Sequence, residues 1–161
     1  MPEQGGMNVN PYDTLVMRPW REAIGLDEGQ WANLTNLVAL HMVLDRMLTL
    51  RLLTALCTLG TVPQGGVEKL AAIVAEMAFG RRLALATECG ILSEESAADL
   101  SEVNRARNTA LHFKPRLKEG FKGIAEIDST ESLNALFRRA TRVFRVLTKE
   151  LLPLFEAAAE D

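Results

Sequence analysis

The apolar residues between positions 34 and 59 recur at helical spacing, and this periodicity constrains the fold more than any other feature of the chain. They are Leu34, Leu37, Val38, Leu44, Leu48, Leu52, Ala55 and Leu59. Such spacing places the side chains along one face of a helix. We therefore expect a first helix from about Gln30 to Leu59, ended by Gly60 and the turn residues that follow it.

The same pattern predicts three further helices. Their expected ranges are residues 67–89, 94–113 and 130–154. Gly80 lies inside the second helix, where we expect a kink or a close helix crossing, and Ser93 is placed to cap the third. Four helices with short connections predict an antiparallel four-helix bundle, extended to five helices if a segment is added.

The composition agrees with an all-α fold. Hydrophobic residues make up 48% of the chain and aromatic residues only 6%, with Leu and Ala dominating, which is unlike a β-sandwich. A length of 161 residues fits one domain with a substantial core. Residues 1–28 are rich in Pro and Gly, so we expect a flexible or loosely packed segment there and the bundle over residues 29–161.

The sequence argues against a membrane protein and a metalloprotein. The longest apolar segment, residues 37–59, carries His41, Asp45 and two arginines, so we expect no membrane span. Cys57 and Cys89 lack metal-ligand spacing and are predicted to be buried free thiols. Together with the absence of an apolar signal region, they favour a cytoplasmic protein without a metal or cofactor.

Positive charge is concentrated in one part of the chain. Residues 105–149 hold eleven Lys or Arg against four Asp or Glu, although the net charge of the whole chain is −3. This asymmetry indicates a local anion-binding face, with a solvated helix surface as the simpler alternative. The basic segment includes Lys114, Arg116 and Lys118, in a stretch predicted to form a short hairpin or an ordered binding loop.

The same segment begins with the spacing Arg-Asn-x-x-x-His at Arg107, Asn108 and His112. Arginine offers a permanent, forked cation to phosphate oxygens, and histidine transfers protons near neutral pH. RNA carries its own nucleophile, the 2′-hydroxyl, so this pair is sufficient for RNA cleavage without a metal. Asn108 is placed to orient a hydroxyl or to fix a neighbouring helix.

Helix geometry complicates this assignment. Residues five positions apart differ by about 140° around a straight helix, so Arg107 and His112 do not share a face. They converge if the helix frays near Phe113, if the Arg107 side chain reaches round, or if a second copy supplies one of them. Arg105 shares a face with His112 more closely and is a second candidate, although Asn108 directly after Arg107 favours Arg107.

Residues 99–112 resemble the signature helix of the HEPN superfamily, which carries Arg, a polar residue and then His. Residues 79–92 are similar to the helix, glycine and apolar turn that precede this motif in mannitol-operon-repressor-like families. The resemblance covers residues 30–155. It implies a helical bundle that dimerises through the motif helices. Many HEPN proteins are metal-independent ribonucleases of toxin, CRISPR and anti-phage systems, whereas others are regulators or binding modules.

From the residues and the resemblance we expect a homodimeric endoribonuclease of toxin or host-defence type. Arg107, His112 and Asn108 are its expected catalytic residues. Single-stranded RNA is expected to contact Arg105, Lys114, Arg116 and Lys118. An antitoxin or regulatory protein is a further expected partner, and a non-catalytic, mannitol-repressor-like interaction module is the alternative. In toxins paired with a nucleotidyltransferase the modified tyrosine follows the histidine by two positions, but here Lys114 stands there, so that modification is not expected.

His41 and Asp45 are a separate candidate pair on the first predicted helix. Their i, i+4 spacing allows them to interact or to reach into a cleft. His41 lies on the apolar line of the helix, however, which favours a hydrogen-bonded histidine in the core or at an interface.

Overall fold

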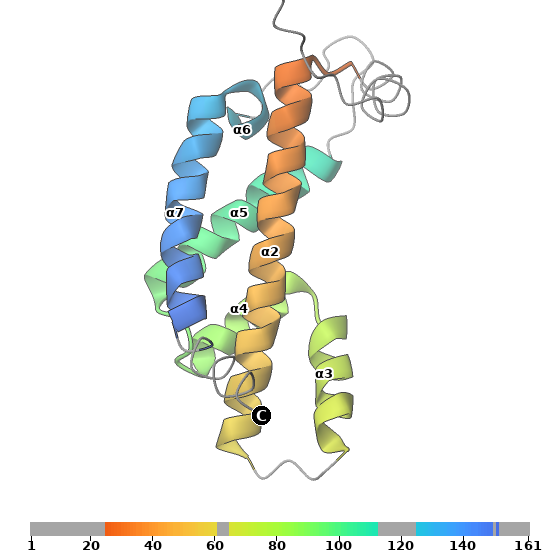
Figure 1. The fold of residues 1–161 in the computed structure, drawn as a ribbon, viewed down its shortest axis with the longest axis vertical. Helices are drawn as coiled ribbons and strands as arrows, with labels where there is room; N and C mark the ends of the chain where they lie inside the picture. The colour runs from red at the N-terminus through yellow and green to blue at the C-terminus, as the bar shows by residue number, and fades with distance from the viewer. Residues whose placement is uncertain (1–24, 61–64, 113–124, 150, 152–161) are drawn as a thin grey trace, which may run out of the picture.

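The computed structural model describes residues 25–60, 65–112, 125–149 and 151, and helix is the only regular secondary structure among these residues (Figure 1). The all-α prediction is therefore confirmed. The helices are α2 (Glu28–Leu59), α3 (Gly66–Glu76), α4 (Phe79–Glu88), α5 (Glu94–His112), α6 (Ala125–Asp128) and α7 (Thr130–Lys149). In Figure 1 the long helix α2 stands at the centre, with α7 on one side and α3 on the other.

Side-chain caps explain where the long helices begin. Asp27 Oδ1 accepts a hydrogen bond from Gln30 N at 2.8 Å, and Gln30 Oε1 accepts one from Asp27 N at 3.1 Å. This reciprocal pair satisfies two backbone N–H groups at the start of α2. Ser93 Oγ accepts from Ser96 N at 3.2 Å at the start of α5, which confirms the cap predicted there.

The second predicted helix is not continuous. Met77 and Ala78 have extended backbone conformations, with ψ angles of 137° and 146°, and they separate α3 from α4. The break lies three residues before Gly80. Val74 before it and Phe79 after it are both buried, so the chain turns between two segments that each face the core.

This break changes the direction of the helices that follow. Asn33 near the start of α2 donates through Nδ2 to Ile127 O at 2.9 Å and accepts through Oδ1 from Thr130 Oγ1 at 3.3 Å. The starts of α2 and α7 therefore lie together, and the two helices run in the same direction (Figure 1). An antiparallel arrangement was predicted for the bundle, and this prediction is wrong for the α2–α7 pair because α4 supplies an extra reversal.

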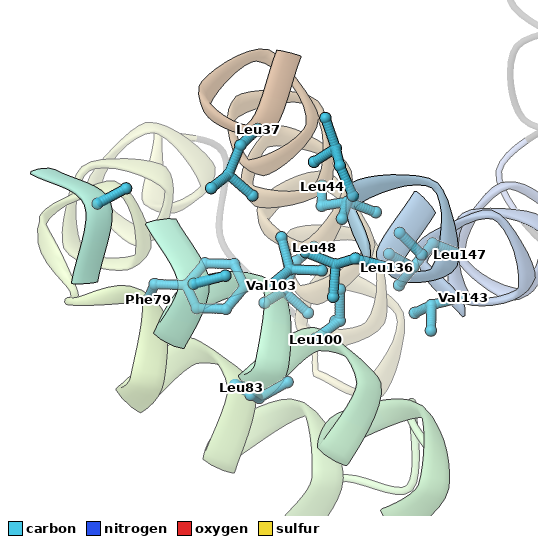
Figure 2. Packing of buried hydrophobic residues seen from close by; sticks show 14 of the residues in the cluster. Leu37, Leu44, Leu48, Phe79, Leu83, Leu100, Val103, Leu136, Val143 and Leu147 are labelled. Atoms are coloured by element: carbon cyan, nitrogen blue, oxygen red, sulfur yellow. The ribbon is translucent and has the colours of Figure 1, made fainter. Parts of the chain in front are cut away.

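The core lies between α2, α4, α5 and α7 (Figure 2). Leu48 and Leu100 are fully buried where α5 crosses α2, and Val143 closes the same layer from α7. Each such leucine contributes roughly 1.5–3 kcal/mol by leaving water. This packed layer fixes the positions of α2, α4 and α5 relative to one another.

Several smaller predictions can be compared with the structure. Cys89 is exposed and Cys57 half-buried, so the burial predicted for Cys89 is wrong; both are free thiols. Within the described helices none is long and apolar enough to cross a membrane. The N-terminal segment predicted to be flexible lies mostly outside the described residues, as do positions 114–124 of the basic loop predicted over residues 114–129. The remainder of that stretch contains the short helix α6, where a hairpin or loop was predicted.

Candidate functional site

A polar cleft lies where α2, α4 and α5 meet. Its volume is about 390 Å³. The cleft is lined by His41 and Asp45 of α2, by residues 77–80 and Arg82 around the start of α4, and by Asn104, Arg107 and Asn108 of α5. The sequence-predicted residues Arg107 and Asn108 thus share a cleft with a histidine from another helix.

A chain of hydrogen bonds crosses the cleft from α5 to α2. Arg107 Nη1 donates to Asn108 Oδ1 at 2.8 Å, and Asn108 Nδ2 donates to Asn104 Oδ1 at 3.3 Å. The same Asn104 oxygen lies 3.2 Å from His41 Nε2. The three α5 side chains are half-buried, so the network is held by the fold while still lining open space.

His41 is only 7% exposed and packs against the Phe79 ring, with ring centroids 4.8 Å apart. Burial lowers the pKa of its imidazole below the usual value, chiefly because the charged form loses water. The guanidinium groups of Arg107 and Arg82 also lower this pKa, whereas the Asn104 hydrogen bond and Asp45 raise it. The neutral form of His41 is therefore favoured at neutral pH.

Arg82 joins α4 to α2 at the floor of the cleft. It is 7% exposed, donates from Nη1 to Thr49 Oγ1 at 2.7 Å, and pairs through Nη2 with Asp45. Its Nε is buried without a hydrogen-bond partner. A buried guanidinium is stable only when carboxylate and hydroxyl acceptors compensate it, so Asp45 and Thr49 hold α4 in place.

The start of α4 adds a second source of positive potential. Ala78 at the N-cap provides no side-chain acceptor, and the cleft lining includes Ala78, Phe79 and Gly80. The first N–H groups of a helix are unpaired without a cap, and they carry partial positive charge. Together with Arg107, this helix start makes the cleft suited to an anionic group.

The other predicted site residues lie elsewhere. Arg105 is 58% exposed and pairs with Glu102 at 2.9 Å and with Glu126 at 3.6 Å, outside the cleft lining. Position 112 ends α5, but the His112 side chain lies outside the described part of the structure. Lys114, Arg116 and Lys118 also lie outside the described residues.

Sequence reasoning missed Asn104 and Arg82, and it favoured a core or interface role for His41. For His41 and Asn104, the sequences of α2 and α5 each contained a signal. His41, Asp45 and Thr49 recur every four residues within an apolar helix, which places three polar groups in one line. Asn104 is spaced i, i+4 from Asn108, so the two side-chain amides are expected on the same face of α5.

No family model, curated protein or solved structure matches this chain. The resemblance to the HEPN superfamily therefore stays a prediction.

In the ranges 25–60, 65–112 and 125–149 no three His, Cys, Asp or Glu side chains lie close enough together to hold a metal ion. A different hollow, of about 370 Å³, lies between α2 and α7 and is lined mainly by apolar residues such as Val43, Phe137 and Phe144.

Proposed function

We propose that this chain is a HEPN-type endoribonuclease of toxin or host-defence type, which cleaves single-stranded RNA without a metal. The observation that carries the proposal is the placement of Arg107 beside the buried His41 and an uncapped helix start in one cleft. A permanent cation and free backbone N–H groups suit the phosphate of an RNA strand. Asn108 holds the Arg107 guanidinium through a 2.8 Å hydrogen bond and so limits its rotamers.

In this proposal Arg107 neutralises the charge that builds up on the phosphate oxygens as the 2′-oxygen attacks. Such electrostatic stabilisation is usually the largest contribution to phosphoryl-transfer rates. His112 transfers a proton to or from the reacting oxygens, a role for which histidine is suited because its unperturbed pKa is near neutrality. Lys114, Arg116 and Lys118 contact the RNA backbone on either side of the cut.

The proposal also includes a second copy of the chain. Helix α5 runs from Glu94 to His112, so positions 107 and 112 remain about 140° apart around its axis. In a two-fold dimer built on α5, Arg107 of one copy meets His112 of the other. The homodimer is thus part of the proposed site.

The test is cleavage of a labelled single-stranded RNA by the purified protein in excess EDTA. Arg107→Ala and His112→Ala should each reduce the rate by about a hundredfold or more. Lys69→Ala removes a charge from an exposed position on α3 and should cleave at the wild-type rate. Equal rates for Arg107→Ala and Lys69→Ala would show that the proposal is wrong.

Mixing the two inactive variants tests the shared site. Heterodimers of Arg107→Ala and His112→Ala contain one intact composite site, so a mixed and re-equilibrated sample should recover about a quarter of the wild-type activity. No recovery in a sample shown to contain heterodimers would place both residues of a site in one chain.

The apolar hollow between α2 and α7 favours one alternative, a non-catalytic interaction module of the mannitol-repressor-like kind. Phe144 and Val43 remain exposed at its rim, where they are suited to contact an apolar side chain of a protein partner. For this alternative, the wild type should leave RNA intact, and Phe144→Ser should abolish association measured by sedimentation velocity. Active cleavage together with unchanged association in Phe144→Ser would contradict it.

A further inference from the structure

His41 lies in the same cleft as Arg107, although it belongs to a different helix and to no recognised motif. The two residues are joined through Asn108 and Asn104 by the hydrogen bonds described above. The nitrogen of the His41 ring that carries the hydrogen follows from which atoms of the network are able to donate a hydrogen bond.

The direction of every bond in the network is fixed from the Arg107 end. A guanidinium has no acceptor, so the Asn108 atom facing it must be the carbonyl oxygen. The Asn108 amide nitrogen then faces Asn104, which must present its own oxygen. That oxygen also faces His41 Nε2, so Nε2 carries a hydrogen and donates to it.

A neutral imidazole with hydrogen on Nε2 has its lone pair on Nδ1. The charged and titratable groups facing His41 are Arg107 from α5, Arg82 from α4 and Asp45 from its own helix. Burial and the two guanidinium groups outweigh the Asn104 hydrogen bond and Asp45, so the pKa of His41 stays lowered and the neutral ring is favoured. Nδ1 is thus able to accept a proton at physiological pH.

We propose that His41 is a second catalytic histidine, which accepts the 2′-hydroxyl proton of an RNA strand whose phosphate is bound by Arg107. This inference rests on the proposed ribonuclease function and names the base that works in the same cleft as the cation. Asn104 is a positioning residue, because its oxygen fixes the hydrogen on Nε2 and so keeps Nδ1 free.

The chemical step balances with groups named here. His41 Nδ1 takes the proton of the 2′-hydroxyl, and the freed electron pair of that oxygen forms a bond to phosphorus. The bond from phosphorus to the 5′-oxygen breaks, and that oxygen takes a proton from an imidazolium, the role of His112. The products are a 2′,3′-cyclic phosphate and a 5′-hydroxyl, and both histidines return to their starting states by exchange with solvent.

The variant that separates catalysis from structure is His41→Gln. A glutamine amide can still donate to Asn104 Oδ1, but it cannot accept and carry a proton near neutral pH. We expect His41→Gln to keep the wild-type melting temperature and to cleave RNA about a hundred- to ten-thousand-fold more slowly. The acidic limb of the pH–rate profile, which reports the free base, should disappear in this variant.

A second measurement reads His41 without turnover. The chain has two histidines, so His112→Gln leaves His41 as the only source of imidazole NMR signals. At neutral pH, ¹⁵N shifts should show hydrogen on Nε2 and none on Nδ1. A 2′-O-methyl oligoribonucleotide, which cannot react, should shift these signals, and adding Arg107→Ala should weaken that response.

The outcomes separate this inference from the proposed function. If the wild type cleaves RNA and His41→Gln has the same rate and pH profile, His41 is not the base. The ribonuclease proposal then remains. Unperturbed His41 signals with saturating oligonucleotide overturn it as well. A wild type that cleaves no RNA overturns the proposed function, and with it the proton transfer assigned to His41.

Discussion

Asn104 Oδ1 on α5 lies 3.2 Å from His41 Nε2 on α2, and this contact joins the motif helix to the longest helix of the structure. The two residues are separated by 63 positions in the sequence. The contact places a neutral imidazole in the cleft that Arg107 lines, so the properties of His41 depend on what occupies position 104.

We predict that Asn104→Asp raises the pKa of His41. A carboxylate in place of the amide favours the charged imidazolium, so the titration midpoint should move upward. The NMR signals of His41, recorded across a pH series, measure this shift directly. Asn134→Asp adds the same charge at an exposed position on α7 and serves as the control. An unchanged midpoint in Asn104→Asp would mean that the two side chains are not in contact in solution.

Folding stability should depend on pH through His41. Its pKa is lower in the folded state than in the unfolded chain, so the unfolded chain binds the proton more readily between the two values. The free energy of unfolding should therefore be highest above about pH 6.5 and decrease as the pH falls through that value. Urea titrations at several pH values should show this decrease in the wild type and a smaller one in His41→Gln. Equal pH dependence of the two proteins would contradict the assignment.

Arg82→Met should destabilise the fold by about 3 kcal/mol, because it leaves Asp45 beside the cleft without its cation. The Asp45 side chain is 30% exposed, so the loss of stability should lie at the lower end of the range for a buried ion pair that loses one partner. Arg81→Met, at an exposed neighbouring position, is the matched control. Urea unfolding measures both variants, and the Arg82→Met, Asp45→Asn double variant should recover part of the loss. Similar stabilities of the two single variants would rule out a structural role for Arg82.

Arg107 and Arg105 should differ in RNA binding. Arg105 is already paired with Glu102 and Glu126, whereas Arg107 lines the cleft with an amide as its partner. Arg107→Ala should therefore weaken binding of a 2′-O-methyl oligonucleotide more than Arg105→Ala does. It should also reduce the slope of log K against log salt by about 0.7, the value for one phosphate contact on a single strand. Fluorescence anisotropy at several salt concentrations measures this binding. A larger loss of binding in Arg105→Ala than in Arg107→Ala would show that RNA binds on the other side of α5.

The sequence was sufficient to predict α2 and α5, because their signals are local. The apolar spacing from Leu34 to Leu59 and the cap at Ser93 each act within one element, and both agree with the structure. The break at Met77 was not predicted, because Val74 and Phe79 on its two sides are buried by contacts with other helices, which local spacing does not show. The contact between His41 and Asn104 was missed for the same reason, since it depends on how α5 crosses α2.

The most direct test of the account compares two substrates, a single-stranded RNA and its 2′-O-methyl analogue, incubated with the wild-type protein in excess EDTA. Mass spectrometry of the products identifies the new ends. We predict that only the RNA is cut, that the fragments end in a 2′,3′-cyclic phosphate and a 5′-hydroxyl, and that Arg107→Ala prepared in parallel produces almost none of them. Intact RNA, or equal cleavage of the 2′-O-methyl analogue, would contradict the account.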